Sequence, residues 1–176
     1  MTVAVRCGMS IRPLLLLCVL TASVARADPE LPRDETWLMI GPLFSGSTRE
    51  AESGVGLEAS LNLADGFQAL GVFGQAQLMK DSHTRLCAGV QGSFMLLGLE
   101  LGVMHETGTR EHVATTGLHV APYFSFIFGS VGVRLGIPLS AAEAPRPRYG
   151  VEGALVLTLK LPVQLGRDAA IPISHR

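Results

Sequence analysis

Apolar and polar side chains alternate with a period of two along most of this chain. The clearest case is residues 149–161, where Leu155, Leu157 and Leu159 share one face and Glu152 lies on the other. A β-strand sends successive side chains to opposite faces, so this period predicts strands. We find no segment with the 3.6-residue apolar period of an amphipathic helix.

Eight such segments are separated by stretches rich in turn-forming residues. The predicted strands are 36–45, 54–63, 67–79, 84–94, 97–104, 113–125, 128–139 and 149–161. Their connections alternate between very short turns and longer polar loops. The predicted long loops are 46–53, 80–83, 106–112 and 140–148. This layout predicts an all-β fold, an eight-stranded antiparallel up-and-down barrel.

The composition of the two strand faces predicts which side of the barrel meets water. The less aliphatic face carries one charge in the seventh strand, Arg134, and none in the first. A solvated exterior normally carries about 25–35% charged residues, whereas a narrow lumen is filled by packed side chains. We therefore expect the aliphatic face to meet lipid, with short periplasmic turns and longer extracellular loops. A soluble periplasmic barrel of the lipocalin kind stays open as an alternative.

The start of the chain has the composition of an export signal. Arg6 and Arg12 precede an apolar run from Leu14 to Leu20, and Ala25-Arg26-Ala27 matches a small-x-small cleavage site. The run is far shorter than the ~20 residues of a membrane-spanning helix, so we expect cleavage after Ala27. The expected division is a signal peptide at 1–27, a lead-in at 28–35, the barrel at 36–161 and a periplasmic tail at 162–176.

Charge and cysteine content exclude several function classes. The whole chain has a net charge of −1, and loss of the leader's arginines makes the remainder more acidic. We therefore expect no nucleic-acid partner. Cys87 is the only cysteine beyond the leader, so an internal disulfide is excluded. We expect this thiol to face the lumen and to be unreactive.

The pattern from Thr36 to Leu161 resembles that of the small OmpA/OmpX-type outer-membrane β-barrels. The resemblance implies the outer membrane of a Gram-negative bacterium, with outer-membrane lipids and the barrel-assembly machinery as partners. Such barrels usually finish with an aromatic residue. This chain departs from that pattern, because its last predicted strand ends at Lys160-Leu161. We also expect a monomer.

Polar side chains on the predicted inner face form the candidate site. A charge in so narrow a space must be paired, since a lone buried charge is strongly destabilising. We expect Arg134 to be the hub, bridged to Glu58, Glu100 or both. The predicted structural network in the lumen is Glu58, Glu100, Arg134, Glu152, His119, Tyr123, Gln75, Gln91 and Lys160.

Two stretches invite a chemical interpretation, and neither matches an established motif. His105, Glu106, Glu111 and His112 flank a predicted hairpin tip and are potential zinc ligands, but their spacing fits no metal motif. The candidate catalytic residues for an esterase or acyltransferase are Ser82, His83 and His105. None of them lies in a G-x-S-x-G motif. We therefore expect no metal, no cofactor and no catalytic residue.

The expected function is non-catalytic: a filled barrel with a structural or surface-interaction role, whose four long loops are the expected place for any surface ligand, which the sequence does not identify. Three alternatives stay open. One is a small channel or porin-like barrel. Another is an outer-membrane enzyme that hydrolyses or transfers acyl chains of lipid A or phospholipids. The third is the soluble lipocalin-like binder already named.

Overall fold

The computed structural model describes residues 33–49, 51–80, 82–126, 128–143 and 145–166. The expected signal peptide and residues 167–176 of the expected tail lie outside this part of the chain. No helix in the described part is long and apolar enough to cross a membrane. Its regular structure consists of β-strands.

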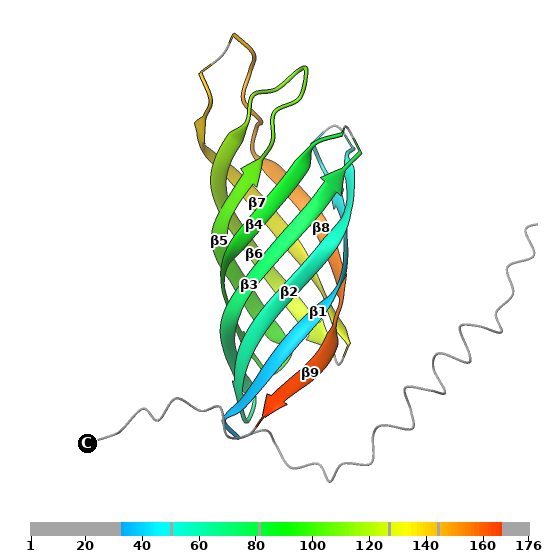
Figure 1. The fold of residues 1–176 in the computed structure, drawn as a ribbon, viewed down its shortest axis with the longest axis vertical. Helices are drawn as coiled ribbons and strands as arrows, with labels where there is room; N and C mark the ends of the chain where they lie inside the picture. Colours follow the sequence, from blue (N-terminus) through cyan, green and yellow to red (C-terminus); the bar gives the residue numbers. More distant parts are fainter. Residues whose placement is uncertain (1–32, 50, 81, 127, 144, 167–176) are drawn as a thin grey trace, which may run out of the picture. The chain divides into compact units, whose positions relative to one another are not determined.

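The strands form one antiparallel sheet that closes on itself (Figure 1). From β1 to β8 each strand pairs with the next along the chain, and the other side of β1 pairs with β8 and β9. The strands are β1 Glu35–Ser47, β2 Ser53–Asp65, β3 Gln68–Met79, β4 Thr84–Phe94, β5 Leu97–Glu106, β6 Thr115–Phe126, β7 Gly129–Ala141, β8 Glu152–Leu159 and β9 Leu161–Gly166. The long loops lie at one end of the barrel and the short turns at the other.

The last two strands are one closing strand in two segments. Leu43 of β1 pairs with Thr158 of β8, and Ile40 pairs with Leu161 of β9, so both segments keep the same register. Pro42 lies between these two pairs and has no N–H for the ladder. The predicted eight-stranded antiparallel barrel is therefore confirmed.

The closing strand does not end where the sequence predicted. Residues 162–166, expected in the tail, belong to β9, while the predicted strand residues 149–151 precede β8. Pro162 indicated a strand end, because proline cannot donate within a paired strand. It is tolerated because β7 starts at Gly129, opposite Leu159, and β9 pairs only with β1 beyond that point.

Backbones approach closely where the barrel closes. An added Cβ on Gly41 of β1 would overlap the carbonyl oxygen of Leu159. Gly46 lies on the same strand, and its added Cβ would meet no atom within 4 Å. Glycine is therefore required at the first position and not at the second.

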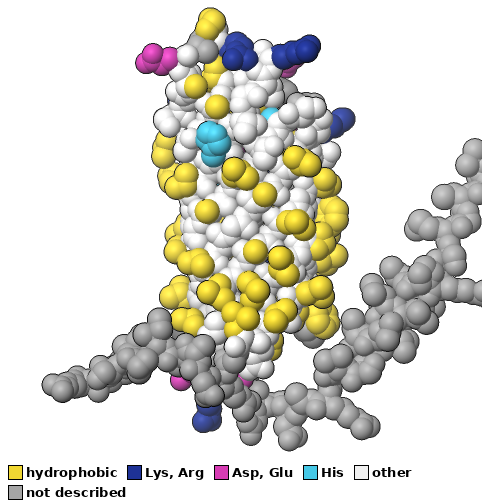
Figure 2. All heavy atoms as spheres, in the orientation of Figure 1, with side chains coloured by type: hydrophobic (Ala, Val, Ile, Leu, Met, Phe, Trp, Pro, Cys, Tyr) yellow, Lys and Arg dark blue, Asp and Glu magenta, His cyan; other side chains and the backbone are white. Residues whose placement is uncertain are grey.

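The two faces of the sheet are inverted relative to a water-soluble protein. Leu, Val, Ile and Phe side chains on every strand point outward, and Figure 2 shows them over the length of the barrel, with charged groups at its ends. The interior holds fully buried charges instead, among them Arg85, Glu106 and Glu152 at 0% exposure. Soluble proteins almost never bury such residues unless they are paired.

Substitution of Gly41 tests the closure. Gly41→Ala should lower the free energy of unfolding in urea by about 1–3 kcal/mol, the usual cost of overpacking, because the new methyl group overlaps the Leu159 carbonyl. Gly46→Ala on the same strand is the matched control and should unfold like the parent. Equal unfolding midpoints for the two variants would contradict the close approach.

Candidate functional site

An ion-pair cluster centred on Arg85 fills the lumen near the long loops. The Arg85 Nε donates to Glu106 Oε1 at 3.0 Å, and its Nη1 donates to Glu152 Oε1 at 2.8 Å. Its Nη2 also contacts both carboxylates. Charge-assisted bonds of this kind offset the cost of removing three charges from water. Arg85 thus joins β4 to β5 and β8 across the lumen.

Two further arginines complete this cluster. Arg49 reaches in from the β1–β2 loop, with its Nη2 2.8 Å from Glu106 Oε1 and 3.3 Å from Glu52 Oε2. Burial by itself lowers the pKa of Arg49. The hydrogen bond to Glu106 and the negative charge of that carboxylate outweigh this effect, so the pKa of Arg49 is raised above its ordinary value. Arg134 lies with its Nη2 3.3 Å from Glu152 Oε1. Three arginines therefore face three glutamates, and the cluster is close to neutral.

Tyr149 covers the cluster from the β7–β8 loop. It is 2% exposed and lies between His112, stacked at a centroid distance of 4.7 Å, and His83, at 5.0 Å. The Arg49 guanidinium lies 4.6 Å from the ring centroid, and the Tyr149 hydroxyl donates to the Thr107 carbonyl at 3.0 Å. Burial raises the pKa of Tyr149. This ring and its neighbours close the long-loop end.

An apolar layer lies below the arginine cluster. Phe73, Cys87 and Met104 form a buried group, and none of them is more than 4% exposed. Along β5, Met104 lies between Glu106 and Glu100, so the layer separates one set of charges from the next. Cys87 is buried within this layer, on the inner face of β4.

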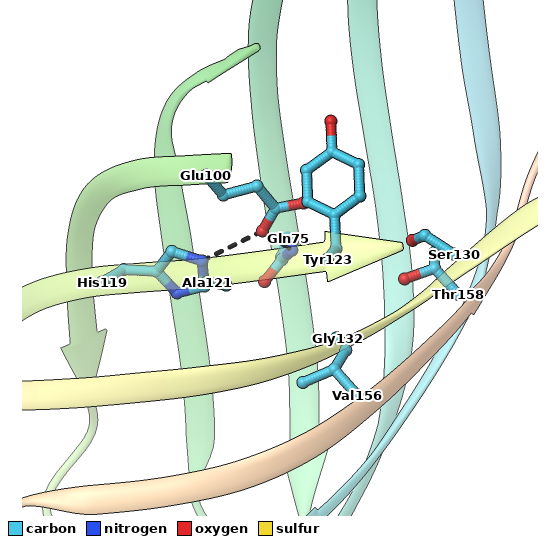
Figure 3. A pocket seen from close by; sticks show the side chains of 9 residues that line it. All are labelled: Gln75, Glu100, His119, Ala121, Tyr123, Ser130, Gly132, Val156 and Thr158. Carbon is cyan, nitrogen blue, oxygen red and sulfur yellow. Dashed lines mark hydrogen bonds and ion pairs between the residues drawn. The ribbon is translucent and has the colours of Figure 1, made fainter. Parts of the chain in front are cut away.

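A second polar cluster lies on the other side of that layer. Lys160 forms an ion pair with Glu58, and His119 Nε2 lies 3.0 Å from Glu100 Oε2 (Figure 3). The Gln75 Nε2 donates to both carboxylates at 3.1 Å and links the two pairs. These five residues are at most 6% exposed. Each carboxylate thus has its own cationic or histidine partner.

The prediction that Arg134 is the hub of the lumen network is wrong. This arginine contacts Glu152 and Gln77, whereas Glu58 and Glu100 pair with Lys160 and His119. The strands of a barrel are tilted and staggered, so height counted along each strand does not identify which side chains meet.

The actual hub, Arg85, was absent from the predicted network. Its alternation with Leu86 places it on the inner face of β4 and was a sufficient signal. Glu106 was missed because it was assigned to a loop, while it is the last residue of β5.

The other predicted lumen residues lie lower in the barrel. Tyr123 is half-buried, and Gln91 is buried with its Nε2 donating to Asn62 Oδ1. A cavity of about 10 Å³ lies beside Gln75, His119 and Tyr123 (Figure 3), room for one water. The lumen is therefore closely filled at this level.

The candidate zinc ligands do not converge. His105 is exposed, with its Nδ1 2.9 Å from Thr116 Oγ1, while Glu106 lies inside the barrel and His112 stacks on Tyr149. Across residues 33–166 as described, no group of three or more His, Cys, Asp or Glu side chains is placed to hold a metal ion.

Ser82 and His83, the other candidate catalytic residues, lie in different environments. Ser82 is exposed, and His83 is buried 3.3 Å from Glu52.

Comparisons with known proteins add a likeness in fold. No protein family model and no curated protein matches this sequence. Among solved structures, the chain is similar to one described as "De novo design of transmembrane beta-barrels". The two share 12% of their residues over 75% of this chain and 99% of that one, with a TM-score of 0.42.

Removal of Arg85 tests the ion-pair cluster. Arg85→Met should lower the free energy of unfolding by about 3–5 kcal/mol, the cost of leaving partner charges buried and alone. Adding Glu152→Gln to that variant should restore part of the loss, because one uncompensated charge is removed. Arg110→Met in an exposed loop is the control. Urea unfolding measures all of these, and parental stability of Arg85→Met would refute the hub.

Proposed function

We propose that this protein is a small outer-membrane β-barrel of a Gram-negative envelope, whose closely filled lumen gives it a structural or surface-interaction role without catalysis. The observation that carries the proposal is the inverted distribution of side chains. Apolar groups cover the outside of the barrel, and paired charges fill its inside. In this proposal the long loops are extracellular and the short turns periplasmic.

The exterior suits a lipid solvent. Soluble monomers rarely expose contiguous apolar patches of more than a few hundred Å², whereas here Leu57, Leu101 and Leu155, on β2, β5 and β8, are 45–62% exposed. Strands of 10–13 residues in β1 to β7 are long enough for a tilted strand to cross a bilayer, for which about 9–11 are needed. A closed sheet leaves few backbone groups unpaired in such a solvent.

Aromatic side chains gather near the short turns. They are 40–58% exposed and point away from the lumen, as the interface girdle of a membrane barrel does. The members are Phe67, Phe94, Phe124, Phe126 and Phe128. This ring supports a membrane boundary at the short-turn end.

The filled lumen favours a structural role over transport. Arg85 and its two carboxylates close one level, the Phe73–Cys87–Met104 layer closes the next, and the Glu58–Lys160 pair lies beyond. An ion would have to break several charge-assisted bonds and then cross an apolar layer. In this proposal, the long loops are therefore the part of the barrel that is available for interactions at the cell surface.

Gel mobility tests the membrane barrel. The protein extracted in detergent should migrate differently with and without boiling, because a folded barrel resists the denaturing detergent. It should also fractionate with outer membranes. A protein that dissolves in plain buffer and shows no mobility shift would refute membrane insertion.

A conductance measurement tests whether the side chains in the lumen block the passage of ions. The parent protein in a planar bilayer should give no unitary current steps. A variant that trims only the first level, Arg85→Ala with Glu106→Ala and Glu152→Ala, should also give no steps once it folds on the same gel, because the Phe73–Cys87–Met104 layer and the Glu58–Lys160 pair still close the lumen. Discrete steps from the parent would make the barrel a channel.

A further inference from the structure

Within the described part of the chain, the short-turn end of the lumen holds a larger cavity than the long-loop end. A cavity of about 200 Å³ lies there. Trp37 and Met39 near the start of β1, Ser93 near the end of β4, and Tyr123 on β6 line it. We call this cavity the short-turn mouth. It is smaller than the ~300–1,000 Å³ pockets that hold drug-sized molecules.

Two amphipathic aromatic rings line this mouth. Trp37 is the only tryptophan of the chain. Tryptophan and tyrosine in membrane barrels normally lie in the outer girdles, yet Trp37 and Tyr123 line the lumen. The Trp37 Nε1 donates to Glu35 Oε2 at 3.1 Å, and the Tyr123 ring occupies the space that a side chain at Gly98 would need. Both rings are therefore held in place.

A buried hydrogen-bond acceptor accompanies these rings. Gln91 lines the mouth and is 5% exposed. Its Nε2 donates to Asn62 Oδ1, and the Asn62 Nδ2 donates to Ser60 Oγ at 3.1 Å. Among the residues that the structure describes, none is a hydrogen-bond partner of the Gln91 Oε1. A buried acceptor in this state is destabilising, and a ligand donor would satisfy it once the Gln91 side chain turns its Oε1 toward the mouth.

The charge of the mouth points to a neutral ligand. Lys160 is the cation that lines it, and its ammonium group is already paired with Glu58. An anion would have to displace that carboxylate. A purely apolar ligand would leave the buried Gln91 Oε1 without a hydrogen-bond donor.

We propose that the short-turn mouth binds a single neutral sugar ring. The C–H face of a pyranose packs on aromatic rings such as Trp37 and Tyr123, and its hydroxyl groups donate to an acceptor such as Gln91 Oε1. The cavity volume limits the ligand to about one ring. The ring is either a free monosaccharide or the end of a glycan chain on the short-turn side of the membrane.

Fluorescence of Trp37 gives a direct test, since no other tryptophan contributes. The purified protein is folded in lauryldimethylamine oxide, a detergent without a sugar headgroup, and titrated with glucose, N-acetylglucosamine and N,N′-diacetylchitobiose. A saturable change with the monosaccharides is the expected result. The same change with the disaccharide assigns the site to a chain end, and its absence assigns the site to a free sugar.

Two results would overturn the proposal. One is the absence of a saturable change with all three saccharides. The other is a change produced only by 1-octanol, which would make the mouth an apolar site.

Matched variants separate Gln91 from general effects. Gln91→Met should weaken binding by about tenfold, because the bond to its acceptor is lost. Gln164→Met is the control, an exposed glutamine at the same end of the barrel that does not line the mouth. Tyr123→Leu is a second variant, which removes a ring and should also weaken binding. Folding of each is checked by the boiling shift, and parental affinity in both Gln91→Met and Tyr123→Leu would refute the site.

Discussion

The pairing of β1 with the closing strand is the constraint on which the rest of the structure depends. An open sheet would leave two edges of unpaired backbone groups, which an apolar solvent does not satisfy. Closure is made in two stretches, β8 with Leu43–Ser47 and β9 with Thr36–Ile40. Pro42 lies between these stretches, and Gly41 beside it allows the backbones to approach. Once the ring is closed, every second side chain must point into a narrow lumen.

The confinement of charge follows from that closure. Eight strands leave an interior only wide enough for packed side chains, so each charge that enters must find a partner inside. The chain meets this requirement with two clusters, one around Arg85 and one around Gln75, separated along β5 by Met104. The polar interior therefore stabilises the barrel and fills it at once.

The two ends of the barrel differ in a way that bears on function. At the long-loop end, Tyr149, Arg49 and two histidines pack over a neutralised cluster. At the short-turn end, Trp37 and Tyr123 line a cavity beside Gln91, whose amide oxygen has no partner in the described part of the chain. We infer that the first end is built for rigidity beneath the loops and the second for contact with a small neutral molecule.

The sequence by itself determined the strands and their faces, because side-chain alternation is a local property of an extended backbone. The segment Thr84–Phe94 was predicted with the bounds that β4 has. Only the tertiary structure decided which charged side chains form pairs. The stagger of the strands places Arg134 beside Glu152, and Glu58 pairs with Lys160 instead. The tertiary structure also decided where the last strand ends. Pro162 is harmless only because β7 has already begun and leaves no strand beside it to receive a hydrogen bond.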